Sequence, residues 1–177
     1  MLIGGLQKTS LADFPGKISA IIFTVGCNFR CGYCHNPELY SLKTANKIAE
    51  DDILFFLEKR KAVLDGAVIT GGEPTLQKDL EPFIRKIKQM GYFVKLDTNG
   101  SNPDIIMRLL QNKLLDYVAM DIKAPLDKYE TAVKRKIDTA KIKKSIDLII
   151  KSGIDYEFRT TVVKDELDES DLVEIAK

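Results

Sequence analysis

The chain has 177 residues, with 27 Lys and Arg against 26 Asp and Glu, so its formal net charge is +1. This balance excludes a strong whole-protein field for nucleic acid or for an anionic membrane surface. With a hydrophobic fraction of 45%, residues 1–177 suit one domain with a substantial core. No apolar run approaches the roughly 18 residues of a membrane span, and no signal-peptide pattern opens the chain. We therefore expect a cytoplasmic protein with no nucleic-acid or membrane partner.

Five short runs of apolar and β-branched residues predict strands, at residues 18–25, 67–70, 92–97, 117–122 and 156–163. Most of these runs are continuously apolar, as is typical of strands buried on both faces of a parallel sheet. Amphipathic patterns between them predict helices around residues 51–57, 80–90, 103–110 and 142–150, and a last helix that begins near residue 170.

This strict alternation of strands and helices predicts an α/β fold with a parallel sheet. Five units are too few to close an eightfold barrel of about 250 residues. We therefore expect an open, partial TIM-like (βα) barrel with a curved parallel sheet. A flat, doubly wound sheet is the alternative.

All three cysteines of the chain, Cys27, Cys31 and Cys34, fall in one C-x3-C-x2-C segment directly after the first predicted strand. Loops at the carboxyl ends of strands are where α/β folds place active sites. Three thiolates on one loop can hold a metal, and His35 could complete a Cys3His zinc site. A redox thiol pair is another interpretation. An iron–sulfur cluster usually takes four cysteines, and this chain has three. We therefore favour a four-iron cluster in which one iron has no cysteine ligand and is open to a further ligand.

The pattern C-x3-C-x-aromatic-C, in which Tyr33 is the aromatic residue, resembles the mark of the radical S-adenosylmethionine (SAM) superfamily. Residues 26–37, GCNFRCGYCHNP, are similar to the form found in activating enzymes of glycyl radical enzymes. Residues 4–10, GGLQKTS, and residues 13–16, DFPG, most resemble the activating protein of anaerobic ribonucleoside-triphosphate reductase.

The resemblance implies that Cys27, Cys31 and Cys34 are the ligands of a [4Fe-4S] cluster. It also implies that SAM binds the fourth iron through its amino and carboxylate groups. Tyr33 is then expected near the adenine or the cluster, with a plain core aromatic as the alternative. His35 is expected to be a hydrogen-bonding residue of the loop rather than a ligand.

The second predicted strand runs into Gly71-Gly72-Glu73-Pro74. Two glycines permit positive φ and a close backbone approach to a ligand, but alone they indicate only a turn. The segment is similar to the Gly-Gly-Glu-Pro motif of the family. The resemblance implies that Gly71, Gly72 and Glu73 bind the amino group of SAM, with Pro74 shaping the turn.

The next two predicted strands end in acidic residues, Asp97 followed by Thr98, and Asp121 followed two residues later by Lys123. Two close carboxylates repel each other unless a cation lies between them. The resemblance implies that these four residues bind the SAM carboxylate, the ribose and a monovalent cation.

Weaker candidates lie at the same edge of the predicted sheet. Asn99 and Gly100 follow Asp97, and ordinary turn chemistry is the alternative reading of that segment. Arg159 lies on the fifth predicted strand, where a surface pair with a neighbouring acidic residue is the alternative.

The resemblance implies an enzyme in which the cluster passes one electron to SAM, giving methionine and a 5′-deoxyadenosyl radical. That radical removes a hydrogen atom from a backbone glycine of a partner, expected to be anaerobic ribonucleotide reductase. A flavodoxin- or ferredoxin-type protein is expected to supply the electron, and no side chain is expected to act as acid or base. Asp13 is expected to contact the glycine-bearing loop of the partner.

Several alternatives stay open at this point. A pyruvate formate-lyase type activase, or a small-molecule radical SAM enzyme such as a deazaguanine synthase, would use related chemistry. A metal-binding partner module without catalysis belongs to a different class. The family barrel usually has six strands, whereas this sequence indicates five and ends inside a helix, so we expect a truncated domain without its sixth strand.

Overall fold

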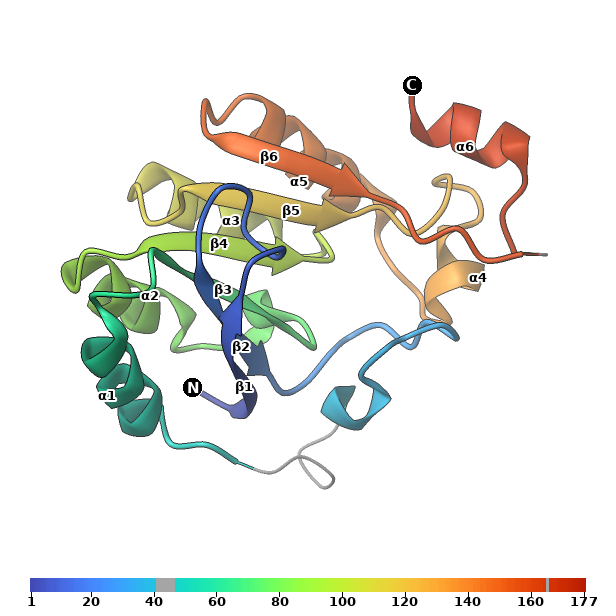
Figure 1. The fold of residues 1–177 in the computed structure, drawn as a ribbon. Helices are drawn as coiled ribbons and strands as arrows, with labels where there is room; N and C mark the ends of the chain where they lie inside the picture. Colours follow the sequence, from blue (N-terminus) through green and yellow to red (C-terminus); the bar gives the residue numbers. More distant parts are fainter. Residues whose placement is uncertain (41–46, 165) are drawn as a thin grey trace.

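A computed structural model describes residues 1–40, 47–164 and 166–177. The strands are β1 (Ile3–Ser10), β2 (Ser19–Thr24), β3 (Gly66–Gly71), β4 (Phe93–Thr98), β5 (Tyr117–Asp121) and β6 (Asp155–Arg159) (Figure 1). The helices are α1 (Glu50–Arg60), α2 (Leu80–Gln89), α3 (Pro103–Gln111), α4 (Tyr129–Val133), α5 (Thr139–Ile150) and α6 (Glu169–Ile175). Two 3-10 turns are η1 (Pro37–Tyr40) and η2 (Pro74–Leu76). Within the described ranges, no helix has the length and apolar character needed to cross a membrane.

The strands form one sheet in the order β1-β2-β3-β4-β5-β6. Strands β2 to β6 run parallel to one another, and β1 runs antiparallel to β2. Because β1 and β6 are the two edges, the sheet is open rather than closed into a barrel (Figure 1). The predicted α/β fold with an open partial barrel is therefore confirmed, and the five predicted strands correspond to β2–β6.

Strand β1 is the strand that the sequence pattern did not predict, so the expected count of five strands is corrected to six among the described residues. Its segment, IGGLQKTS, contains two glycines and three consecutive exposed polar residues. An edge strand with one side open to solvent needs no continuous apolar run, which removes the signal that marked the other strands. The additional strand, β1, is antiparallel and forms the edge of the sheet beside β2.

One face of the sheet is covered by α1, α2, α3 and α5 (Figure 1). The predicted apolar stripe of α2 is fully buried there; its members are Leu80, Phe83, Ile84 and Ile87. They belong to one core cluster with Ile22, Ile69 and Leu96, which point to that face from β2, β3 and β4. Helix burial on this side fixes which strand residues must point to the opposite face, because side chains alternate along a strand.

The opposite face is covered, at the amino ends of the strands, by the loop that joins β1 to β2. The Phe14 ring packs against Val68, and its centroid lies 5.9 Å from that of Tyr117 at the start of β5. Lys95 on β4 donates a hydrogen bond from Nζ to the Asp13 carbonyl oxygen at 2.6 Å. These contacts hold the loop across the sheet, so polar side chains on this face have room only toward the carboxyl ends of the strands.

Replacing Phe14 by Ala is expected to lower the free energy of unfolding by about 3–5 kcal/mol, because a ring that is 4% exposed leaves a cavity. Urea unfolding followed by circular dichroism measures the change. The matched control is Phe55→Ala on α1, where the ring is 66% exposed and the expected change is within about 0.5 kcal/mol. Equal losses in the two variants would show that the loop does not seal this face.

Candidate active site

The carboxyl ends of β2 to β5 surround a cavity that also receives the cysteine loop. Its lining includes every residue that the sequence analysis assigned to the cluster or to SAM, namely Cys27, Cys31, Cys34, Tyr33, Gly71, Gly72, Glu73, Asp97, Thr98, Asp121 and Lys123. These residues extend from Cys27 to Lys123 in the sequence. They meet here because parallel strands end at the same edge of the sheet. The cavity is therefore the place where these motifs can act together.

The cysteine loop is held in shape by its own neighbours. Arg30 donates from Nη1 to the carbonyl oxygens of Cys27 and Phe29, each at 2.6 Å. The Tyr40 hydroxyl donates to the Cys31 carbonyl oxygen at 3.0 Å, and the Arg30 guanidinium lies 4.6 Å from the centre of the Tyr40 ring. Backbone carbonyl groups of the loop are thus bonded by Arg30 and Tyr40, and its three cysteines form no disulfide.

The three thiols suit an iron–sulfur cluster better than a single zinc ion. Within the described ranges, no three His, Cys, Asp or Glu side chains are grouped closely enough to hold one metal ion. A four-iron cluster makes a weaker demand, since each cysteine binds a different iron, and thiolates are its usual ligands. Burial raises the pKa of Cys27 to about 11, so metal binding there must displace a proton.

Gly71 and Gly72 allow the end of β3 to lie directly against the end of β2. A Cβ atom on Gly71 would lie 2.4 Å from the Thr24 nitrogen, and one on Gly72 would lie 2.2 Å from the Gly26 carbonyl oxygen. Gly71 also has a φ of +112°. The two glycines therefore permit a backbone-to-backbone contact that fixes the start of the cysteine loop, in addition to any approach to a ligand.

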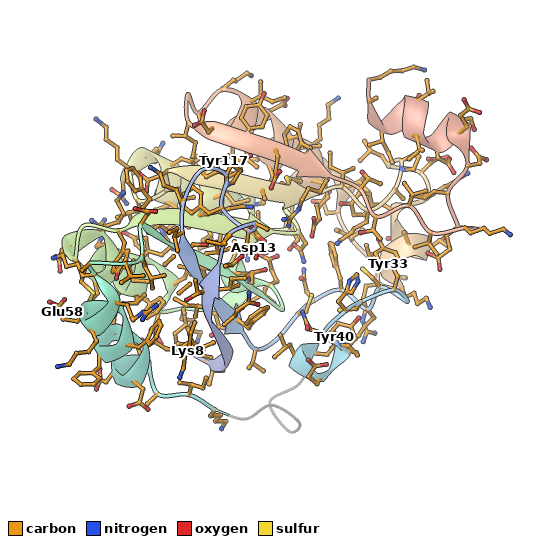
Figure 2. All side chains as sticks on the ribbon, in the orientation of Figure 1. Lys8, Asp13, Tyr33, Tyr40, Glu58 and Tyr117 are labelled. Atoms are coloured by element: carbon orange, nitrogen blue, oxygen red, sulfur yellow. The ribbon has the colours of Figure 1, made fainter. Side chains whose placement is uncertain are left out.

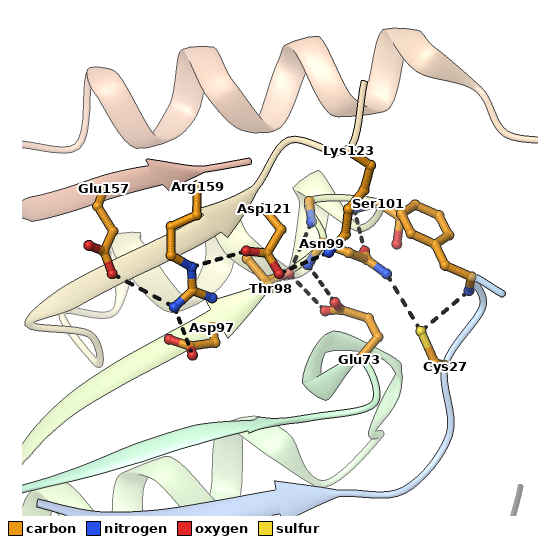
Figure 3. A network of polar contacts seen from close by, with 12 residues as sticks. Cys27, Glu73, Asp97, Thr98, Asn99, Ser101, Asp121, Lys123, Glu157 and Arg159 are labelled. Carbon is orange, nitrogen blue, oxygen red and sulfur yellow. Dashed lines mark hydrogen bonds and ion pairs between the residues drawn. The ribbon is translucent and has the colours of Figure 1, made fainter. Parts of the chain in front are cut away.

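Glu73 lies at the centre of a buried hydrogen-bond network (Figure 3). Its carboxylate accepts hydrogen bonds from the Thr75 amide at 3.0 Å, the Thr75 hydroxyl, the Thr98 hydroxyl at 2.8 Å and the Asn99 amide at 2.7 Å. Burial raises the pKa of the carboxyl, and these four donors oppose that effect. With both oxygens bonded inside the protein, the side chain joins β3 to β4, and its binding of the SAM amino group stays a prediction.

Asn99 continues this network to the cysteine loop. Its Nδ2 donates to Asn28 Oδ1 at 2.9 Å and lies 4.0 Å from Cys27 Sγ. Asn28 in turn donates to the Ser101 hydroxyl at 2.9 Å, and the Ser101 amide donates to Asn99 Oδ1 at 3.0 Å. A residue that the sequence marked only as a weaker candidate thus connects Glu73 with Cys27.

The carboxylates of Asp97 and Asp121 meet through basic side chains rather than directly (Figure 3). Arg159 lies 3.0 Å from Asp121 and 3.3 Å from Asp97, and Lys123 lies 3.1 Å from Asp121. Burial raises the pKa of Asp97, while the nearby Arg159 and Lys95 oppose this shift. The predicted proximity of the two acidic residues is therefore present, and Arg159 belongs to the same cluster.

Tyr33 presents an unused polar atom to the cavity. Its hydroxyl is buried and has no hydrogen-bond partner among the residues that the structure describes. Lys123 Nζ lies 5.8 Å from the centre of its ring. A buried hydroxyl without a partner is costly, so this atom is available to a bound molecule in the cavity, which fits SAM.

Asp13 lies apart from this cavity. Its side chain accepts a hydrogen bond from the Ser10 hydroxyl within the β1–β2 loop. Figure 2 shows Asp13 near the middle of the sheet, away from Tyr33 and Tyr40 beside the cysteine loop. Its expected contact with a partner loop stays a prediction.

Seven lining residues were outside the predicted site set, namely Phe29, His35, Asn36, Tyr40, Thr70, Asn99 and Thr161. Arg159, which contacts two lining residues, was predicted only as a weaker candidate. Alternation along β6 could have placed Glu157 and Arg159 on one face, whereas Tyr40 has no sequence signal beyond its closeness to the cysteines.

Comparison with known proteins identifies the family. Residues 21–177 match the Radical SAM superfamily. A Methanocaldococcus jannaschii protein, provisionally named as a glycyl-radical enzyme activating enzyme, is 43% identical over 181 residues, which cover 99% of this chain and 74% of that protein.

Two further relatives carry other names. The 7-carboxy-7-deazaguanine synthase of Koribacter versatilis is 35% identical, over 83% of this chain and 62% of its own length. The pyruvate formate-lyase-activating enzyme of Clostridium pasteurianum is 30% identical, over 68% of this chain and 52% of its own length.

A solved structure, native anSMEcpe with bound AdoMet, superposes with a TM-score of 0.57 at 19% identity. The match covers 75% of this chain and 40% of that protein, and it supports the fold alone. The family match over residues 21–177 and the 43% identity across almost the whole chain show that this protein is an enzyme of the radical SAM superfamily, whose cofactors are a [4Fe-4S] cluster and SAM.

Proposed function

We propose that this enzyme activates a glycyl radical enzyme. The observation that carries the proposal is the convergence of three cysteines and three strand-end motifs on one cavity. The relative that matches 99% of the chain supports it, since it bears an activating-enzyme name. When bound, the cluster and SAM supply a 5′-deoxyadenosyl radical that takes a hydrogen atom from a glycine of the partner.

In this proposal the chain binds and orients the reactants. Cys27, Cys31 and Cys34 hold the cluster, and Tyr33 packs against the bound SAM. Lys123, which is 15% exposed and faces the cavity, offers its ammonium to the SAM carboxylate. Holding both reacting groups in one orientation contributes most of what a protein can add to such a reaction.

We further propose anaerobic ribonucleotide reductase as the partner, because residues 4–16 resemble the matching segment of its activating protein. Asp13 lies in that segment and is proposed to contact the glycine-bearing loop. A flavodoxin- or ferredoxin-type protein is the proposed electron donor. The cytoplasm is the proposed location, since three free cysteines suit a reducing compartment.

A second candidate is a deazaguanine synthase, favoured by the 35% identity to the Koribacter enzyme over 83% of the chain. The two candidates differ in their product. Anaerobic incubation with anaerobic ribonucleotide reductase should give a glycyl-radical signal in electron paramagnetic resonance if the activase proposal holds. Formation of 7-carboxy-7-deazaguanine, with no glycyl radical, would favour the second candidate.

Replacing Cys31 by Ala is expected to abolish the cluster and the formation of 5′-deoxyadenosine, because one of three iron ligands is lost. The assay reconstitutes the protein with iron and sulfide, adds dithionite and SAM, and measures 5′-deoxyadenosine by chromatography.

The matched control is His35→Ala, which removes the neighbouring residue that a Cys3His zinc site would need. The cluster should persist in that variant, with its brown absorbance retained. If His35→Ala loses metal as completely as Cys31→Ala, or if the wild type binds zinc and forms no cluster, the catalytic proposal fails and a metal-binding module replaces it.

Replacing Lys123 by Ala is expected to raise the dissociation constant for SAM about tenfold, because a charged contact to a carboxylate is worth roughly 1.5–3 kcal/mol. Equilibrium dialysis of the reconstituted protein measures it. The control is Lys128→Ala, whose ammonium pairs with Asp171 at 2.7 Å and lies outside the cavity lining. Similar losses in both variants would remove Lys123 from the SAM site.

A further inference from the structure

The Arg159 guanidinium occupies the space between two acidic strand ends (Figure 3). Its Nε lies 3.0 Å from Asp121 Oδ1, and its Nη1 lies 3.3 Å from Asp97 Oδ2. A single planar cation therefore contacts both carboxylates. The resemblance to the family implies a monovalent cation bound by the group that contains these carboxylates.

Sheet register explains how one side chain reaches two strands. Arg159 on β6 pairs with Asp121 on β5, while Asp97 on β4 pairs with Ala119 on β5. Glu157 also pairs with Ala119 from the other side. Because Ala119 carries only a methyl group, the guanidinium can pass over β5 and reach Asp97 on the strand beyond.

The remaining charged side chains around Arg159 also form ion pairs with one another. Lys95 Nζ lies 3.0 Å from Glu157 and 3.6 Å from Asp97 Oδ1, and Lys123 Nζ lies 3.1 Å from Asp121 Oδ2. The Arg159 Nη1 atom lies 3.8 Å from Glu157 Oε1. Among the described residues, each acidic group in this cluster thus has a basic partner on the protein itself.

A metal ion placed between Asp97 and Asp121 would meet the positive charge of Arg159 at close range. Like charges at such a distance repel, and each carboxylate already has a basic partner, although Asp97 Oδ1, 3.6 Å from Lys95 Nζ, accepts no hydrogen bond among the described residues. Arginine is also suited to this role, since its guanidinium stays charged and presents several donors in a fixed plane.

We propose that Arg159 is a built-in cation that holds Asp97 and Asp121 in place, so that this enzyme binds SAM without a potassium or sodium ion between them. Arg159 is thus a positioning residue that acts through the two carboxylates. The inference rests on the proposed function only where SAM binding is measured.

The first measurement uses the wild-type chain alone, melted in choline chloride, sodium chloride or potassium chloride at about 0.15 M, where screening is equal. The melting temperatures should agree within about 1 °C. The dissociation constant for SAM, measured on the reconstituted protein, should agree within about twofold among the salts. A wild type that needs potassium for tenfold tighter SAM binding, or that potassium stabilises by several degrees, overturns the proposal.

The second measurement uses Arg159→Met, which keeps the length of the side chain and removes its charge. In choline chloride its melting temperature should fall by roughly 4–8 °C, and potassium should restore at least about half of the loss by entering between the two carboxylates. Arg159→Lys should stay independent of the salt used. An Arg159→Met protein that melts alike in potassium and choline also overturns the proposal.

The matched control is Arg108→Met on α3, which removes an arginine that lies 3.1 Å from Glu81 and is 55% exposed. It should show no potassium-dependent change. The melting arm needs neither cluster nor SAM, so a failure of the radical chemistry leaves it unaffected. If Arg159→Met does not fold, the wild-type arm alone decides.

Discussion

The site depends on one contact between two backbones, the close approach of the end of β3 to the end of the neighbouring parallel strand β2. Without side chains at Gly71 and Gly72, the chain approaches Thr24 and Gly26 closely enough for the Gly72 amide to donate to the Thr24 carbonyl oxygen and the Glu73 amide to the Gly26 carbonyl oxygen, each at 2.8 Å. This contact fixes where the cysteine loop begins and where Glu73 enters the protein. Any larger residue would push the two strand ends apart, and with them the cysteine loop and Glu73.

Two separate networks, one of hydrogen bonds and one of ion pairs, organise the side chains around the cavity. One is built on Glu73 and passes through Asn99 and Asn28 to the side of Cys27. The other is a set of ion pairs on β4, β5 and β6, with Arg159 at its centre. The first network is buried around Glu73, Thr98 and Asn99 and consists mostly of uncharged donors, so it gives fixed geometry there. From the second network, Asp97, Asp121 and Lys123 line the cavity, and Arg159 balances the charge of the two carboxylates, which suits a ligand that is itself zwitterionic.

Much of this arrangement is predictable from the sequence because parallel strands bring their carboxyl ends together. Once β-branched runs place β2 to β5, the cysteine segment, Gly71, Asp97 and Asp121 must meet at one edge. Strand β1 could not be predicted from the sequence because this edge strand has no continuous apolar run. The role of Arg159 depends on the register across β5 and on the small side chain of Ala119, neither of which a single sequence displays. The hydrogen bonds of Glu73 to Thr98 and Asn99 could not be predicted either, because a single sequence does not show which side chains meet between neighbouring strand ends.

The Phe14 ring and the loop that carries it bear on the side from which a substrate can reach the cavity. They cover one face of the sheet at the amino ends of its strands, whereas the cavity lies at the carboxyl ends. A molecule that reacts in the cavity is therefore expected to enter on the side of the cysteine loop. The proposed polypeptide substrate would then enter as a loop folded back on itself, with both flanking segments outside the cavity.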